Sequence, residues 1–153
     1  MFTKRFTVVP AAYVLLRRDD DQVLLQLRQN TGYLDGHWAL GAAGHVERGE
    51  SVFEAACREA AEELDVGIDP AALTPLCVMH RTKRSGQAID ERVDFFFECR
   101  TWRGEPRRRE PKYAADLRWV TLDALPEPVV PHERHVLEKL SDGTLEAVVP
   151  FGF

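Results

Sequence analysis

Apolar residues occur along the chain in short runs that turn-rich stretches separate. β-Branched and aliphatic residues fill Thr7 to Arg17 and Gln22 to Arg28, on either side of the polar cluster Arg18 to Asp21. This pattern predicts two strands joined by an Asp-rich turn. The glycine-bearing segment Gln29 to Trp38 follows and is predicted to be a loop, an element that often carries binding groups.

Two further strands are predicted in the middle of the chain. Leu73 to His80 and Val93 to Cys99 are largely apolar, and the basic stretch Arg81 to Gly86 lies between them as a turn. We expect the two strands to pair as a hairpin. The aromatic run Phe95 to Phe97 indicates that the second strand is buried on both faces.

The last third of the chain begins with a polar, proline-interrupted loop, Trp102 to Lys112. A short strand is predicted at Leu117 to Val120, followed by a helix from His132 to Leu140 that Gly143 ends. Leu145 to Val149 is predicted to form a last short strand.

The clearest helix signal lies in the stretch Gly44 to Val66, GHVERGESVFEAACREAAEELDV. Ser51 and Glu54 form a capping box, so the helix is predicted to begin at about Val52. At about 100° per residue, one apolar stripe would face a core. Its members are Phe53, Ala56, Cys57, Ala60 and Leu64.

These elements define the fold class. Strands outnumber helices, one helix lies in mid-chain and another comes late, and no internal repeat is present. The pattern predicts an α/β (α+β) protein with a mixed sheet packed between helices. A length of 153 residues fits one domain, residues 1–153, with a core that needs no disulfide or metal staple.

Composition and charge narrow the function classes. The chain is 44% hydrophobic and 29% charged, which is ordinary for a globular protein, and its formal net charge is -5. A general nucleic-acid binder would carry a basic surface, so a nucleic-acid polymer is not an expected partner. A nucleotide substrate remains compatible with the charge, because metal ions can stand between acidic residues and phosphates.

The cysteines and the N-terminus indicate a cytoplasmic protein. Cys57, Cys77 and Cys99 are widely spaced, which predicts buried free thiols in a reducing compartment. The apolar run from Phe6 to Leu16 is interrupted by Pro10 and is shorter than the roughly 20 residues of a membrane span. We therefore expect a first strand there, with neither a signal peptide nor a membrane partner.

Three acidic residues of the mid-chain helix are candidate metal ligands. Glu59, Glu62 and Glu63 fall within an arc of about 100°, beside the apolar stripe. Mg²⁺ takes oxygen ligands and is usually held by one or two carboxylates, water and substrate phosphate. A solvated acidic helix face explains the three residues equally well when they are taken alone.

The loop before the helix favours the metal site. Gly44, five residues, Glu50, seven residues and then Arg58-Glu59-Ala-Ala-Glu62-Glu63 form a long gapped motif. The motif closely resembles the signature box of the Nudix hydrolases, which split a nucleoside diphosphate linked to another group. The resemblance implies the family's α/β/α sandwich with a mixed central sheet.

The resemblance also implies roles for the box residues. Glu59, Glu62 and Glu63 correspond to the catalytic, metal-binding acids, and the Gly44 carbonyl to a further ligand, for Mg²⁺ or Mn²⁺. Arg58 and Glu50 look like the pair that braces the loop against the helix. The sequence departs from the family where Asp65 replaces the glycine that ends the helix, where Ala43 precedes Gly44, and at Ala60.

The sequence offers two possible ends for this helix, Asp65 and Gly67. Asp tolerates the left-handed conformation better than most residues, while Gly67 offers an alternative end just beyond.

Outside the box the predictions are less specific. Arg28 and Tyr33 are the preferred substrate contacts, and Glu110 matches the loop acid that some members use as a metal ligand or general base, although Glu105 lies in the same loop. Other basic residues are expected to be solvated more often than to bind phosphate: Arg81, Lys83, Arg84 and Arg107 to Arg109. Tyr113 is a second loop aromatic, whereas Trp38 and Trp119 are expected in the core. His132 and His135 are predicted on an ordinary helix surface.

The predicted function is metal-dependent hydrolysis of a pyrophosphate bond, with a nucleoside triphosphate as the preferred substrate, as in MutT-like members. ADP-ribose, other nucleotide sugars and dinucleotides are alternatives. A Nudix-fold module that senses a nucleotide without cleaving it is the second hypothesis, and a purely structural acidic helix is the third. A homodimer, the commonest assembly among soluble oligomers, is compatible with the sequence.

Overall fold

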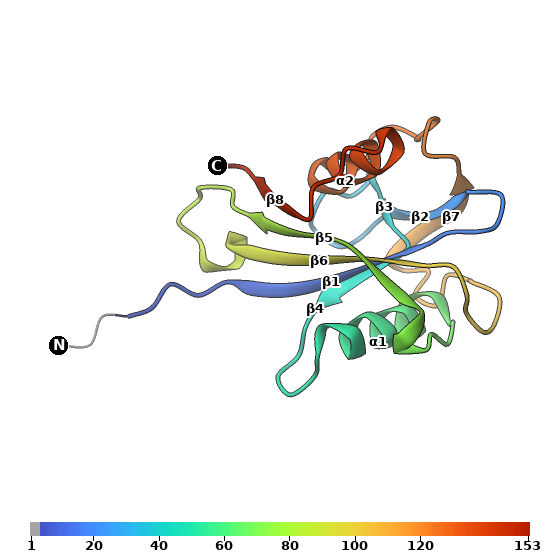
Figure 1. The fold of residues 1–153 in the computed structure, drawn as a ribbon, viewed down its shortest axis with the longest axis horizontal. Helices are drawn as coiled ribbons and strands as arrows, with labels where there is room; N and C mark the ends of the chain where they lie inside the picture. Colours follow the sequence, from blue (N-terminus) through green and yellow to red (C-terminus); the bar gives the residue numbers. More distant parts are fainter. Residues whose placement is uncertain (1–3) are drawn as a thin grey trace.

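The computed structural model describes residues 4–153, and its strands form two sheets (Figure 1). One sheet has five strands in the order β4-β1-β6-β5-β8. Its strands are β1 (Val9–Leu16), β4 (Ala42–His45), β5 (Leu73–Arg81), β6 (Arg92–Cys99) and β8 (Val148–Phe151). The other sheet is antiparallel, in the order β3-β2-β7, and consists of β2 (Val23–Arg28), β3 (Trp38–Leu40) and β7 (Ala114–Val120).

The five-stranded sheet is mixed, as the sequence predicts. β1 runs parallel to β6 and β5 parallel to β8, whereas the β1–β4 and β5–β6 pairs are antiparallel. The predicted hairpin is thus the β5–β6 pair. β1 has β4 on one edge and β6 on the other, which leaves no free edge for β2. The chain therefore changes sheets at the turn after β1, where a single bridge joins Arg17 to Val23.

Two helices cover opposite faces of the five-stranded sheet (Figure 1). α1 (Val52–Leu64) lies against β1 and β4, and α2 (Pro131–Asp142) lies on the other side. Short 3₁₀ helices, η1 (Pro70–Ala72) and η2 (Ala88–Asp90), precede β5 and β6. Among residues 4–153, no helix is long and apolar enough to span a membrane.

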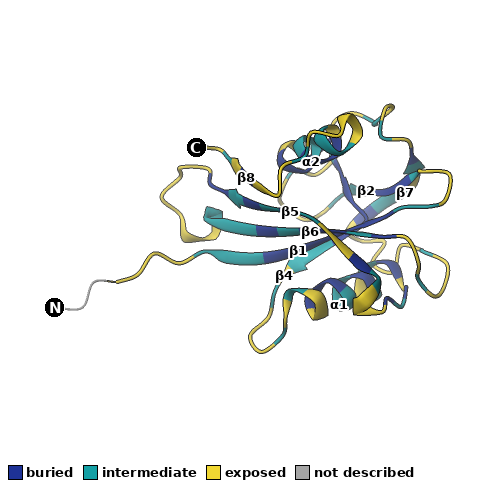
Figure 2. Ribbon diagram, in the orientation of Figure 1, coloured by how far each residue is buried: buried dark blue, intermediate teal, exposed yellow. Residues whose placement is uncertain are grey.

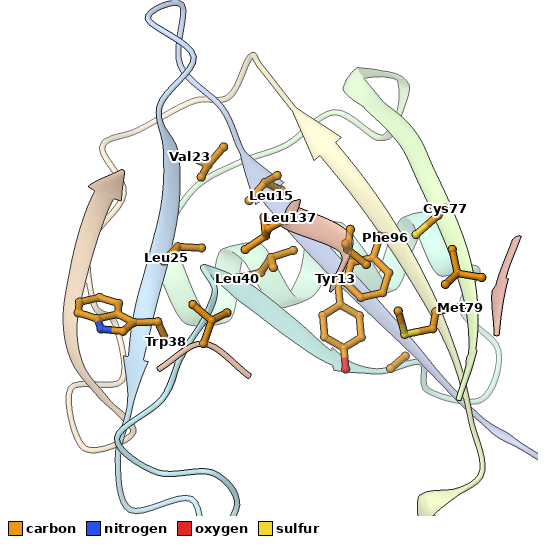
Figure 3. Close-up of a cluster of buried hydrophobic side chains, with 14 of the residues drawn as sticks. Tyr13, Leu15, Val23, Leu25, Trp38, Leu40, Cys77, Met79, Phe96 and Leu137 are labelled. Carbon is orange, nitrogen blue, oxygen red and sulfur yellow. The ribbon is translucent and has the colours of Figure 1, made fainter. Parts of the chain in front are cut away.

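Buried side chains form one apolar cluster on each side of this sheet (Figure 2). The α2 side contains Phe96, Leu15 and Leu137 (Figure 3), and the α1 side contains Phe97 and Leu64. Adjacent residues of β6 therefore face opposite cores, which confirms that its centre is buried on both faces.

Several boundaries differ from the predicted ones. β7 begins at Ala114 rather than Leu117, because pairing with β2 extends to Arg28. The last strand is Val148–Phe151 rather than Leu145 to Val149, since Leu145 packs on the α2-side core from the loop before the strand. The short strands β3 and β4, which flank Gly41, were not predicted.

Candidate active site

Helix α1 begins at the predicted residue. The Glu54 N–H donates to Ser51 Oγ at 3.1 Å, and the Ser51 N–H donates to Glu54 Oε1 at 3.5 Å. The buried face differs from the predicted stripe at two residues: Ala55 is fully buried, and Phe53 is 38% exposed. The Phe53 ring lies at the edge of the core, 5.0 Å from that of Phe97.

Glu59 extends from α1 to the backbone of β4. Its side chain is 13% exposed, and its carboxylate lies where a side chain of residue 44 would have to be. Burial raises the pKa of Glu59, against the hydrogen bond and charge of Arg58, and the charge of Glu62 raises it further. Glycine at position 44 is thus what lets this carboxylate reach the strand.

Glu63 is the most enclosed of the three acids. Its Oε2 accepts the N–H of Ala43 at 2.7 Å. Burial raises the pKa of Glu63 well above its ordinary value, against that hydrogen bond, and the charges of Glu59 and Glu110 raise it further. Two neighbouring carboxylates in this setting favour a shared proton or a bound cation.

Arg58 connects the loop to the helix. Its Nε and Nη2 donate to the two carboxylate oxygens of Glu50 at 3.1 and 2.7 Å, and Nη2 also donates to the His45 carbonyl at 3.0 Å. Its Nη1 lies 2.7 Å from Glu59 Oε1. One half-buried guanidinium therefore ties the loop between β4 and α1 to the acidic face of the helix.

Glu62 is the most accessible acid of the group. Its side chain is 52% exposed, and its Oε2 accepts from Arg58 Nη1 at 3.3 Å. As they stand, no three His, Cys, Asp or Glu side chains within residues 4–153 form a metal-binding group.

A cavity of about 540 Å³ opens beside Glu63. Residues of six strands, both helices and two loops line it. Glu63 and Gly44 form the wall nearest the acids, Gln26 and Tyr13 come from β2 and β1, and Arg92 comes from β6. Through Glu63, the acidic face of α1 therefore forms part of the cavity wall.

The exposed side of the cavity is formed by two loops that meet. Arg28 Nε donates to the Tyr33 carbonyl at 2.9 Å, and Arg28 Nη2 donates to Thr31 Oγ1 at 3.0 Å. Lys83, from the segment after β5, places its Nζ 4.3 Å from the centre of the Tyr33 ring. The predicted contacts Arg28 and Tyr33 thus both line the cavity.

A buried polar group lies on the inner side of the cavity. Tyr13 Oη is 3.0 Å from His132 Nε2, and Arg81 Nε donates to Asp94 Oδ2 at 2.8 Å. Figure 3 shows the Tyr13 hydroxyl pointing away from the apolar side chains of Leu15, Val23 and Leu137. Burial lowers the pKa of His132 to about 2, so this imidazole is neutral. The expected surface positions of Arg81 and His132 are therefore wrong, since both are at most 5% exposed.

Glu133 completes this inner side. It is 3% exposed, and its Oε1 accepts the N–H of Leu40 at 2.8 Å. Burial raises its pKa to about 7, against the hydrogen bond from Leu40. The cavity is thus also lined, on α2, by a buried carboxyl group whose pKa is close to neutral pH.

The comparison with protein families decides the identity of the site. The sequence profile of the NUDIX domain matches residues 7–140, which spans α1, its preceding loop and every wall of the cavity. The chain belongs to the NUDIX domain family. It is a Nudix hydrolase, an enzyme that acts on phosphoric anhydride bonds, and such hydrolases generally use divalent metals.

Solved structures agree with this assignment. The chain is similar to a MutT NUDIX hydrolase from Burkholderia pseudomallei, with 31% identity and a TM-score of 0.76 over 88% of this chain and 98% of the other. The Escherichia coli ORF135 protein shares the fold at 23% identity and a TM-score of 0.72, over 90% and 91% of the two chains. A MutT protein from Bacillus halodurans shares it at 20% identity and a TM-score of 0.69, over 94% and 87%. No curated protein sequence matched the chain.

The remaining candidate residues of this Nudix hydrolase do not line the cavity. Tyr113 is 43% exposed and Arg84 is exposed, and neither lines the cavity. Trp38 is buried as predicted, whereas Trp119 is only half-buried. Glu110 is exposed, but the neighbouring Arg109 N–H donates to the Glu63 carbonyl at 3.1 Å.

The predicted free thiols are present. Cys77 and Cys99 are buried and Cys57 is half-buried, and all three are free. Burial raises the pKa of Cys77 to about 11, so its thiol is protonated and unreactive at neutral pH.

Sequence reasoning missed the inner side of the cavity. The available signal was weak: His132 and Glu133 precede Val136 and Leu137 by four residues each, so they share the buried face of α2. That spacing places both polar side chains inside the protein, where their groups need partners.

Proposed function

We propose that this Nudix hydrolase converts a nucleoside triphosphate to a nucleoside monophosphate and pyrophosphate, with Mg²⁺ or Mn²⁺. The observation that carries the proposal is the position of Glu63, which belongs both to the acidic face of α1 and to the cavity wall. A polyphosphate held at the acids therefore continues directly into a space of about 540 Å³, within the usual range of ligand pockets.

The residues present fit a divalent cation. Burial raises the pKa of both Glu59 and Glu63, the charge of Glu59 raises that of Glu63 further, and Gly44 provides a cradle that any side chain would fill. Glu59, Glu62 and Glu63, with the Gly44 carbonyl, would hold the ion once Glu62 turns from Arg58. When bound, such an ion neutralises phosphate charge and lowers the pKa of a bound water.

The chain's own side chains supply the rest. Arg28 and Arg92 line the cavity and have no carboxylate within 4.0 Å among residues 4–153, so their charge is available to phosphate oxygens. Tyr33 offers an aromatic face to the base or sugar. As the water oxygen bonds to phosphorus, the bond to the pyrophosphate oxygen breaks, and a glutamate of the site takes the proton. We assign this role to Glu110 or to one of the box glutamates.

The inner side of the cavity supports a nucleoside as the group enclosed. Gln26, Arg81 and Glu133 provide donors and acceptors at the bottom of an otherwise partly apolar space. A few placed polar groups in such a space are the usual basis of selectivity for small ligands.

The proposal is tested by measuring products from nucleoside triphosphates, ADP-ribose and dinucleotides, with Mg²⁺, Mn²⁺ or chelator. We expect monophosphate and pyrophosphate from a triphosphate, loss of both in Glu63→Gln, and normal rates in Glu146→Gln, an exposed matched control. Release of diphosphate and phosphate, or turnover of ADP-ribose alone, would overturn the proposed reaction. Metal-dependent binding without any turnover would favour the sensing module instead.

A further inference from the structure

The end of α1 is held by a distant segment of the chain. Arg107 N–H donates to the Leu64 carbonyl at 3.0 Å, and Arg109 N–H donates to the Glu63 carbonyl at 3.1 Å. Arg109 Nη1 donates to the Ala61 carbonyl at 3.0 Å. Carbonyl groups at a helix end lack partners within the helix, so the segment supplies partners for those of Glu63 and Leu64, while the Ala61 carbonyl also accepts the N–H of Asp65 at 3.1 Å.

Asp65 adds a side-chain contact to this arrangement. It ends α1 in the left-handed conformation, with φ 59° and ψ 36°, where the family usually has glycine. The left-handed residue carries a carboxylate, and Arg107 Nε donates to its Oδ2 at 2.7 Å. The strain of a non-glycine residue at this position is thus accompanied by a contact that glycine could not make.

Backbone contacts fix the segment on both sides of this ion pair. Gly67 and Arg103 exchange two backbone hydrogen bonds of 3.0 and 2.9 Å. On the other side, the Glu110 carbonyl accepts from the N–H groups of Tyr113 and Ala114 at 2.9 and 3.2 Å, at the start of β7. Glu110 therefore lies between β7 and the three bonds that Arg107 and Arg109 make to α1.

We propose that Asp65, Arg107 and Arg109 are positioning residues that hold Glu110 at the acidic site by fastening its segment to the end of α1. Glu110 is the next residue after Arg109, whose N–H is bonded to Glu63, so movement of the segment moves Glu110 relative to the helix that carries the box acids. The inference rests on the proposed function, in which Glu110 acts on the substrate or its attacking water.

The test uses two variants that break the same ion pair from opposite sides. Asp65→Gly removes the carboxylate but suits the left-handed conformation, and Arg107→Ala leaves the helix end untouched. We expect each to lower kcat roughly tenfold with KM within about twofold, because a small displacement of a catalytic group is costly. The double variant should lose no more than either single one, and neither change should lower kcat further in a Glu110→Gln background.

The matched control is another exposed ion pair of an arginine and a carboxylate, Arg134 Nε to Glu138 Oε1 at 2.6 Å on α2. Arg134→Ala should leave kcat unchanged. Hydrogen exchange without substrate gives a readout independent of activity: the amides of residues 103–110 should exchange faster in Asp65→Gly and Arg107→Ala, and at the normal rate in Arg134→Ala.

The outcomes separate the two proposals. If the wild type hydrolyses no substrate, the proposed function fails, and the exchange data still decide whether the pair fixes the segment. Unchanged exchange, or a normal kcat in an active Arg107→Ala enzyme, would overturn the positioning role. A further loss of kcat in the Glu110→Gln background would show that the pair acts through some residue other than Glu110.

Discussion

A methyl group at Gly44 would lie 2.1 Å from Oε1 of Glu59 and 2.7 Å from its Oε2. The carboxylate therefore rests directly on the backbone of β4. It is the far end of a flexible side chain, so the fold can yield to a larger residue by moving Glu59 alone. A substitution at position 44 should therefore change the stability of the fold little and the function strongly.

We accordingly expect Gly44→Ala to leave the free energy of unfolding within about 1 kcal/mol of the wild type. Hydrolysis should fall by roughly a hundredfold, because a displaced acid no longer stabilises charge at the reacting centre. Urea unfolding and steady-state kinetics measure the two effects. Normal turnover in this variant would mean that Glu59 works equally well from another position.

The ionised Glu63 carboxylate should lower the stability of the folded protein when no metal is bound. Its pKa is raised, so the folded state favours the protonated acid, and stability is lost as pH rises above the pKa of an unfolded glutamate. Glu63→Gln should therefore raise the thermal midpoint at pH 8 by roughly 3 °C or more, and by less at pH 5. The variant should also lose the stabilisation that Mg²⁺ and nucleotide together give the wild type.

Glu146→Gln, at an exposed position, should show neither effect. A Glu63→Gln protein that is less stable than the wild type at pH 8 would contradict the argument.

The part of this site on α1 was predictable from sequence, because it depends on contacts between residues that are close together in the chain. Ser51 and Glu54 are three residues apart and set the start of α1, from which the positions of Glu59, Glu62 and Glu63 follow. The sequence offered two possible ends for the helix, Asp65 and Gly67. The left-handed backbone of Asp65 shows that the helix ends there.

The rest of the cavity depends on the register of distant strands. Arg81 meets Asp94 only because Met79 pairs with Asp94 in the β5–β6 hairpin, which turns a residue of a basic stretch into half of a buried ion pair. Likewise, Glu133 finds the N–H of Leu40 across 93 residues of sequence. Periodicity places such residues on a buried face but does not identify their partners.

Arg58 should contribute to stability as well as to the site. Its side chain is 23% exposed and bonds both oxygens of Glu50, so Arg58→Ala should lower the free energy of unfolding by about 1–3 kcal/mol. The loss should shrink when Mg²⁺ is present, because the ion takes over the neutralisation of Glu59 and Glu62.

A double-mutant cycle with Glu50→Ala measures how much of the Arg58 effect belongs to that pair, and we expect clear non-additivity. Arg58→Lys should recover only part of the loss, since an ammonium group cannot bond both carboxylate oxygens in the same planar geometry. Additive losses from the two alanine changes would show that the interaction between Arg58 and Glu50 does not contribute to the free energy of unfolding.

The last prediction concerns Glu133, which lies on α2, on the opposite side of the cavity from α1. Its carboxyl group is buried, and its pKa of about 7 lies above the ordinary 4.5. The protonated form is thus favoured by folding, so the group's contribution to stability is complete at pH 4 and lost as pH rises towards 8. The loss amounts to roughly 3 kcal/mol.

Glu133→Gln keeps an oxygen for the Leu40 N–H but cannot ionise. We expect it to be more stable than the wild type at pH 8 and nearly equal at pH 5, as measured by urea unfolding at both values. Glu138→Gln, on the exposed face of the same helix, should show no such difference. If Glu133→Gln gains no stability between pH 5 and 8, the carboxylate must already have a compensating partner in the cavity, and Arg28 would be the first to examine, because its charge lowers the pKa of Glu133 more than that of Arg81 does.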